Sequence, residues 1–167
     1  MEKSGSEKEF GKALEAAWRL ISYRPRSRRE LADRLARKGF EPDLVEEVLA
    51  HLAGLGEVDD LAFSRLWVKS REATKPMGRF RLQCELREKE VSPQIIEEAL
   101  AEYTPDKELE LAKTAAQRRW LILEKLENDP YKRMQKLKKW LERRGFSPEV
   151  IIRVAEDLRT EGTTSDS

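Results

Sequence analysis

The chain has 167 residues, of which 39% are charged and 39% apolar, and its basic and acidic side chains nearly cancel to a formal net charge of +1. Its one cysteine, Cys84, and one histidine, His51, exclude an intrachain disulfide framework and argue against a conventional zinc site. No segment approaches the roughly 20 consecutive apolar residues that span a bilayer, and the polar N-terminal stretch is unlike a secretory signal. We therefore expect a cytoplasmic protein with no membrane contact, metal or cofactor.

In chain order the sequence predicts helices throughout. Phe10, Leu14 and Trp18 begin a series of apolar residues at helical spacing, whereas the alternation typical of strands is absent. Prolines and glycines divide this series into about nine helical segments. The fold class is therefore predicted to be all-α.

One pattern occurs three times along the chain. Residues 35–45, 86–96 and 141–151 align without a gap as Leu-x-x-basic-x-apolar-x-Pro-x-aliphatic-aliphatic. The pattern predicts a helix that ends near a glycine, followed by a helix with proline in its first turn. One further helix precedes each pair, which gives a three-helix unit of about fifty residues.

The boundaries follow from this repeat. We expect three three-helix repeats at residues 10–55, 56–103 and 104–159. A unit of this size has a small core, so the repeats are expected to stack in an elongated row that can curve. Residues 1–9 and 160–167 are polar and are expected to be disordered.

The second repeat departs from the pattern at one position. Gly39 and Gly145 stand where a helix end requires a left-handed residue, but the equivalent residue is Glu90. A left-handed glutamate is strained, so we expect this helix end to be closed differently.

Charge is segregated between helices. The second helix of each repeat is basic, and the third helix of the first two repeats is acidic. Aligned strips of this kind suit binding to a polyanion or a charged protein polymer, although a merely solubilising surface gives the same pattern. Candidate binding residues lie at helix starts and away from the apolar stripes: Arg26, Arg28, Arg29, Lys69, Arg71, Lys75, Arg79, Arg81, Lys132, Arg133 and Lys136.

No catalytic set emerges from the remaining polar residues. There is no Gly-rich phosphate loop, and His51 is interpreted as an ordinary helix residue. Cys84 is expected to be partly exposed, and the Asp59-Asp60 pair is expected to cap a helix, because other metal ligands are missing nearby.

The tryptophans divide into two groups. Trp18, Trp67 and Trp120 continue apolar stripes and are assigned to the core rather than to base stacking. Trp140 is less clear, because it aligns with Glu85, which is expected at the surface.

Three motifs resemble those of the RecX regulators of the RecA recombinase. Residues 24–40 resemble the opening motif, Arg-Pro-x-Ser-x-x-Glu-Leu-x-x-x-Leu-x-x-Lys-Gly-Phe. Residues 58–63, Val-Asp-Asp-x-x-Phe, followed by Arg71, are similar to the second, and residues 78–89 to the third. The resemblance covers roughly residues 11–158, with Glu90 in place of the usual glycine.

The resemblance implies a function as well as the fold. It implies a non-enzymatic, cytoplasmic modulator that binds the groove of the RecA filament on DNA across neighbouring protomers. Such a protein suppresses ATP hydrolysis, strand exchange and the filament's coprotease role. The expected partners are the RecA filament and, weakly, single- and double-stranded DNA, and the chain is expected to be a monomer.

Two other classes remain open from the residues alone. The segment from Ser27 to Val45 could pass for a helix-turn-helix, which would make the chain a DNA-binding module that acts by competition for DNA. A repeat scaffold for an unrelated protein would depend on neither DNA nor RecA. An enzyme is the least favoured class.

Overall fold

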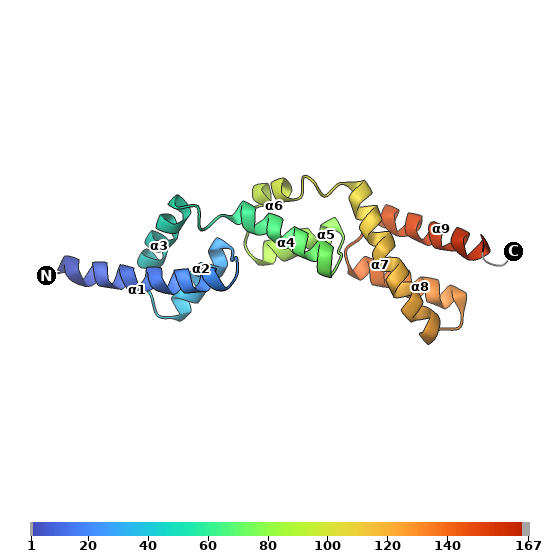
Figure 1. Cartoon of the computed structure of the whole chain (residues 1–167), viewed down its shortest axis with the longest axis horizontal. Coiled ribbons are helices and arrows are strands. Elements are labelled where there is room, and N and C mark those ends of the chain that lie inside the picture. Colours follow the sequence, from blue (N-terminus) through green and yellow to red (C-terminus); the bar gives the residue numbers. More distant parts are fainter. Residues whose placement is uncertain (1, 165–167) are drawn as a thin grey trace. The chain divides into compact units, whose positions relative to one another are not determined.

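The structure, a computed structural model, describes the backbone of residues 2–164 and the side chains of residues 5–160. Over this range the chain forms nine helices and no strand (Figure 1). Three helices fall in each expected repeat, which confirms an all-α fold of three three-helix repeats. The helices are α1 (Glu2–Tyr23), α2 (Arg28–Arg37), α3 (Pro42–Gly54), α4 (Asp60–Thr74), α5 (Arg79–Glu88), α6 (Pro93–Ala99), α7 (Pro105–Leu126), α8 (Pro130–Arg143) and α9 (Pro148–Thr164).

The helices at the two ends are longer than expected. Helix α1 begins at Glu2 rather than near Phe10, and α9 continues to Thr164. No proline interrupts either extension, and each residue added to an existing helix brings one further backbone hydrogen bond. Met1 and residues 165–167 of the two expected tails lie outside the described residues.

Two compact units make up the described chain, and they do not separate at the joints between repeats. One unit holds α1, α2, α3, α6 and the first half of α4, and the other holds the second half of α4, most of α5, and α7 to α9. The divisions fall after Leu66, Glu85 and Ala99, all within the second repeat. The middle repeat therefore contributes to both units instead of forming one of its own.

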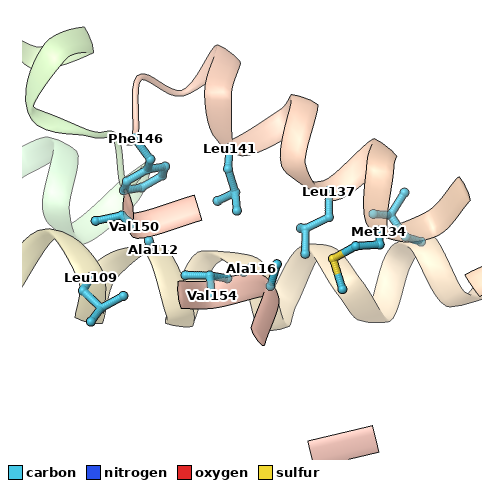
Figure 2. Packing of buried hydrophobic residues seen from close by; sticks show 11 residues of the cluster. Leu109, Ala112, Ala116, Met134, Leu137, Leu141, Phe146, Val150 and Val154 are labelled. Carbon is cyan, nitrogen blue, oxygen red and sulfur yellow. The ribbon is translucent and has the colours of Figure 1, made fainter. Parts of the chain in front are cut away.

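Each unit has an apolar core built from helical stripes. In the first unit, α1 supplies small residues, and α2 and α3 supply aliphatic ones: Ala13, Ala17, Leu31, Leu35, Val45, Val48, Leu49 and Leu52. In the second unit, α7 takes the position that α1 has in the first unit and packs against α8 and α9 (Figure 2). Its buried residues include Leu109, Ala112, Ala116, Leu123, Met134, Leu137, Leu141, Phe146, Val150 and Val154. Small residues on α1 and α7 leave room for the larger apolar side chains of the two helices that pack against each of them.

The helix end at Glu90 closes in the same way as its two counterparts, so the expected alternative closure is wrong. Glu90 has φ +53°, beside +90° at Gly39 and +76° at Gly145. In all three repeats the N–H of the next residue donates to the carbonyl of a leucine five residues earlier, over 3.2 to 3.4 Å. These cap bonds and the burial of Val91 outweigh a left-handed strain of about 1–2 kcal/mol.

Candidate partner-binding surfaces

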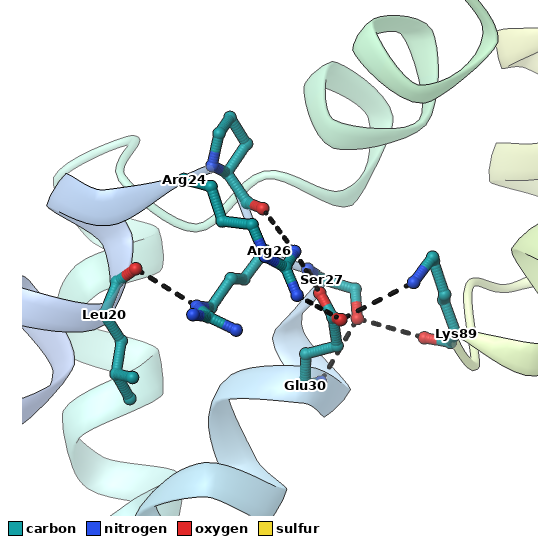
Figure 3. A network of polar contacts seen from close by, with 7 residues as sticks. Leu20, Arg24, Arg26, Ser27, Glu30 and Lys89 are labelled. Atoms are coloured by element: carbon teal, nitrogen blue, oxygen red, sulfur yellow. Dashed lines mark hydrogen bonds and ion pairs between the residues drawn. The ribbon is translucent and has the colours of Figure 1, made fainter. Parts of the chain in front are cut away.

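The first unit contains a polar junction between the first two repeats (Figure 3). Ser27 caps α2 by accepting the Glu30 N–H at 3.1 Å, and its own N–H faces the Glu30 carboxylate at 3.4 Å. The same hydroxyl donates to the Lys89 carbonyl at 3.1 Å, and the Arg28 N–H donates to Asp60 Oδ1 at 2.8 Å. The start of α2 is thus bonded to two segments of the following repeat.

The carboxylate of Glu30 is held between two cations at this junction. Arg24 Nη2 lies 3.0 Å and Lys89 Nζ 3.5 Å from Glu30 Oε1. Burial works against ionisation of Glu30, but the Arg24 hydrogen bond and the Lys89 charge outweigh it and hold the pKa of Glu30 below its usual value. The Glu30 hydrogen bond in turn raises the pKa of Arg24.

The second unit repeats this junction with equivalent residues. Gly78, which aligns with Ser27, donates its N–H to the carbonyl of Arg144, which aligns with Lys89, at 2.8 Å. The N–H of Arg79, like that of Arg28, donates to a carboxylate of the next repeat, Glu108 Oε1, at 3.3 Å. In both units, the N-terminus of the second helix of a repeat is therefore hydrogen-bonded to the next repeat, where the second helix of that next repeat ends.

Three of the predicted basic residues hold the scaffold together. Each guanidinium donates to backbone carbonyls at or just beyond the C-terminal end of a helix, where partners inside the helix run out. Arg26 reaches Leu20 O at 3.1 Å, and burial lowers its pKa; Arg79 reaches Leu100 O at 2.7 Å and Tyr103 O at 3.3 Å; Arg133 reaches Glu127 O at 3.2 Å.

Two further predicted residues converge on Glu85. Arg71 Nε lies 2.8 Å from Glu85 Oε2, and Arg81 Nε lies 4.0 Å from Glu85 Oε1. Trp67 Nε1 also donates to Glu85, at 2.9 Å, and the Arg71 guanidinium lies 4.5 Å from the Trp67 ring centre. Glu85 is 8% exposed, so its expected surface position is wrong: two donors, Trp67 and Arg71, and the nearby charge of Arg81 compensate the burial of its carboxylate.

The remaining predicted residues are on the surface. Arg28, Arg29 and Lys136 form partly exposed ion pairs with Glu46, with Asp33 and Glu90, and with Glu127. Lys69, Lys75 and Lys132 are exposed and make no ion pair with another described residue. These three lysines leave a partner with charges that the fold does not use.

An apolar groove of about 840 Å³ lies in the second unit, and the sequence analysis missed it. Phe80 is 65% exposed and Ile152 54% exposed along it, with Phe146 and the stems of Lys138 and Lys139 beside them. Exposed apolar side chains grouped in this way mark interaction sites. The available signal was Ile152, which stands where the other two repeats have glutamate.

Two smaller predictions concern the Asp59-Asp60 pair and Cys84. Asp59 caps α4 by accepting the N–H groups of Leu61 and Ala62 at 2.9 and 3.0 Å, and Asp60 binds the start of α2, so the capping interpretation is confirmed. Cys84 is half-buried, as expected. Among the side chains of residues 5–160, no cluster of His, Cys, Asp and Glu suits a metal ion. None of the described helices combines the length and apolarity of a membrane span.

The tryptophans largely follow the expectation. Trp18 and Trp120 are partly buried against the two cores, in agreement with their stripe positions. Trp67 instead belongs to the polar cluster around Glu85. Trp140 packs against the core of the second unit, and the guanidinium of Arg144 lies 4.3 Å from its ring centre.

Comparison with known proteins places this architecture in one class. Residues 13–52, 59–100 and 106–154 match the first, second and third three-helix domains of RecX, in that order. The chain therefore belongs to the RecX family of regulatory proteins.

The sequences of individual relatives match this chain over nearly its whole length. The regulatory protein RecX of Prosthecochloris aestuarii is 37% identical over 158 residues, 93% of this chain and 99% of the relative. That of Amycolatopsis mediterranei is 34% identical over 160 residues, 95% and 90% of the two chains. The crystal structure of RecX from Lactobacillus salivarius matches with a TM-score of 0.81 at 25% identity, covering 92% of this chain and 99% of that one.

Proposed function

We propose that this chain is a non-enzymatic regulator of the RecA recombinase that binds the groove of the RecA filament on DNA across neighbouring protomers. In that position it suppresses ATP hydrolysis, strand exchange and coprotease activity. The observation that carries the proposal is the match of all three repeats to RecX domains, in order. The chain acts as a cytoplasmic monomer and also binds single- and double-stranded DNA weakly.

Repetition supplies the physical mechanism. Once one repeat is bound, the others search for their sites at a high effective concentration, so weak contacts to successive protomers add to a useful affinity. A protein that binds one state of the filament more tightly than another shifts the equilibrium toward that state by mass action. Inhibition then requires no chemistry on the part of this chain.

The surfaces of the second unit suit a protein partner. Phe80 and Ile152 expose apolar area beside Lys138 and Lys139, whereas a pure DNA site is expected to be more uniformly basic. The unpaired lysines Lys69, Lys75 and Lys132, with Arg81, would add electrostatic attraction. The ion pairs of Arg28, Arg29 and Lys136 are partly exposed, so a partner can displace them at small cost.

The test is DNA-stimulated ATP hydrolysis by the cognate RecA, with this chain titrated in at fixed DNA and salt. We expect hydrolysis to fall at concentrations too low to coat the DNA. A fall that appears only when the protein saturates the DNA would overturn filament binding.

The second candidate is a DNA-binding module that acts by competition. The exposed lysines without a carboxylate partner favour it, because phosphate neutralisation uses such charges. Its signature is an inhibition that follows DNA binding and weakens steeply with salt, whether or not RecA is present.

A further inference from the structure

A second, smaller pocket in the second unit is lined by several positively charged side chains. It has a volume of about 250 Å³, several times the roughly 30 Å³ that one water occupies in the liquid. Three arginines line it, namely Arg118 and Arg119 on α7 and Arg144 after α8, together with Trp140 and the apolar wall of Ile122. No carboxylate is among the described residues that line it.

Two of these guanidinium groups lie against the same indole ring. Arg144 is 4.3 Å and Arg119 is 5.8 Å from the ring centre of Trp140. Arg144 Nη1 donates to the Pro76 carbonyl at 3.0 Å, whereas the buried Nε of Arg119 has no hydrogen-bond partner. Burial, and then the positive charge of Arg119, lower the pKa of Arg144, so the two charges repel each other.

At the equivalent position in the first unit, the cation is paired with a carboxylate. Lys89 aligns with Arg144, and its ammonium lies 3.5 Å from the carboxylate of Glu30. The residue that aligns with Glu30 in the second repeat is Arg81, so the matching carboxylate has been replaced by another cation. Among residues 5–160, neither Arg119 nor Arg144 forms an ion pair.

An unpaired buried N–H and two unneutralised neighbouring charges both cost folding free energy. One anion in the pocket removes both costs, and the apolar wall strengthens the attraction by excluding water. Planar guanidinium groups match the oxygens of phosphate, often with two parallel hydrogen bonds. We propose that this pocket binds a phosphate group, with Arg119 and Arg144 donating to its oxygens and Arg118 at the rim.

The test compares thermal unfolding of the full chain in inorganic phosphate and in sodium chloride of equal ionic strength. Phosphate is expected to raise the Tm of the parent above the chloride value. Arg119→Met keeps the aliphatic stem but removes the charge and the unpaired N–H. It is expected to unfold at the same or a higher Tm without phosphate, and to bind phosphate at least about tenfold more weakly, the loss expected for one charge-assisted hydrogen bond.

The matched control is Arg143→Met. Arg143 is an exposed arginine at the end of α8, next to Arg144, and does not line the pocket. This variant should keep the full phosphate response. The proposal is overturned if phosphate and chloride act alike on the parent, or if the two variants lose the response equally. Arg144 is unsuitable for the test because its guanidinium also donates to the Pro76 carbonyl.

The source of the phosphate is then distinguished with a single-stranded oligothymidylate. If the group belongs to a nucleic-acid backbone, Arg119→Met weakens oligonucleotide binding relative to Arg143→Met, and inorganic phosphate competes. If it belongs to a small phosphate compound, both variants bind the oligonucleotide equally while only Arg119→Met loses the Tm response. The assignment of a phosphate site does not depend on RecA binding, so it can fail or hold independently of the proposed function.

Discussion

A β-carbon on Gly78 would lie 2.0 Å from the carbonyl oxygen of Gly145. The two glycines belong to consecutive repeats, and the backbones meet where the Gly78 N–H donates to the Arg144 carbonyl. No rotation of a side chain relieves this contact, because the opposing atoms are backbone. The junction in the second unit therefore depends on the absence of a side chain at residue 78.

The first prediction is that Gly78→Ala destabilises the protein by about 2 kcal/mol or more, because the methyl group forces the junction apart. Urea unfolding followed by circular dichroism measures the change. Gly11→Ala is the control, since nothing lies within 4 Å of its β-carbon position in α1. That variant should gain about 0.5–1 kcal/mol, and a Gly78→Ala protein of parental stability would contradict the close approach.

The second prediction concerns the left-handed residue at position 90. Glu90→Gly relieves the backbone strain and loses only a half-exposed ion pair to Arg29, 3.4 Å long. We expect a gain of about 0.5–1 kcal/mol in the free energy of unfolding. Glu90→Ala removes the same ion pair but keeps the strain, so it should show no gain; equal effects of the two changes would rule out strain as the cause.

The third prediction is a pH dependence centred on Glu30. Its pKa is lowered in the folded state, so its contribution to stability is present above the ordinary value of 4.5 and is lost as pH falls through the folded-state pKa. Glu30→Gln should therefore be less stable than the parent at neutral pH, with the difference shrinking in acid below pH 4.5. The exposed Glu88→Gln serves as control, and unfolding curves from neutral to acid pH give the comparison.

The fourth prediction tests the apolar groove. Phe80→Ala should leave the unfolding free energy within about 0.5 kcal/mol of the parent, because the ring is exposed. It should nevertheless weaken the suppression of RecA ATP hydrolysis. Leu126→Ala removes a side chain that is 70% exposed on α7 and does not line the groove. Equal inhibition by both variants would remove the groove from the partner surface.

The fifth prediction separates the basic residues by their roles. Replacing Lys69, Lys75 and Lys132 together by alanine should leave the helix content and stability unchanged but weaken filament or DNA binding, more so at low salt. Arg79→Ala should instead destabilise the fold by about 1–3 kcal/mol, because it removes the guanidinium donor from the Tyr103 carbonyl and one of two donors from the Leu100 carbonyl. Binding assays at two salt concentrations, beside unfolding curves, show whether the two groups differ.

Much of the fold was predictable because the signals are local. Gly39 and Gly145, with the prolines that follow them, mark the helix ends, and the threefold alignment then sets the repeats. The partners of Glu85 and Arg144 could not be found in this way. Their contacts join a helix of one repeat to the neighbouring helix or to the next repeat, and an alignment within repeats carries no information on such pairs.

The basic candidates show the same limit from another side. Arg71, Arg79 and Arg81 are close in sequence and equal in charge, yet their surroundings differ. Arg71 lies against Trp67 and pairs with Glu85, Arg79 donates to the carbonyls of Leu100 and Tyr103, and Arg81 is exposed with only a 4.0 Å ion pair to Glu85. Composition gives the number of cations on a segment. Only their hydrogen-bond partners tell which of them are available to another molecule.

The junctions also differ between the first two repeats and the third, at the start of the second helix. Helices α2 and α5 start on the helix end of the following repeat, but α8 begins one turn earlier relative to the alignment and is capped by its own Asp129, which accepts the N–H groups of Tyr131 and Lys132. The residue that aligns with Ser27 and Gly78 is Arg133, inside the helix. A fourth unit could not join by the same contact unless the first turn of α8 unwound, so a single added turn limits how far this mode of stacking can propagate.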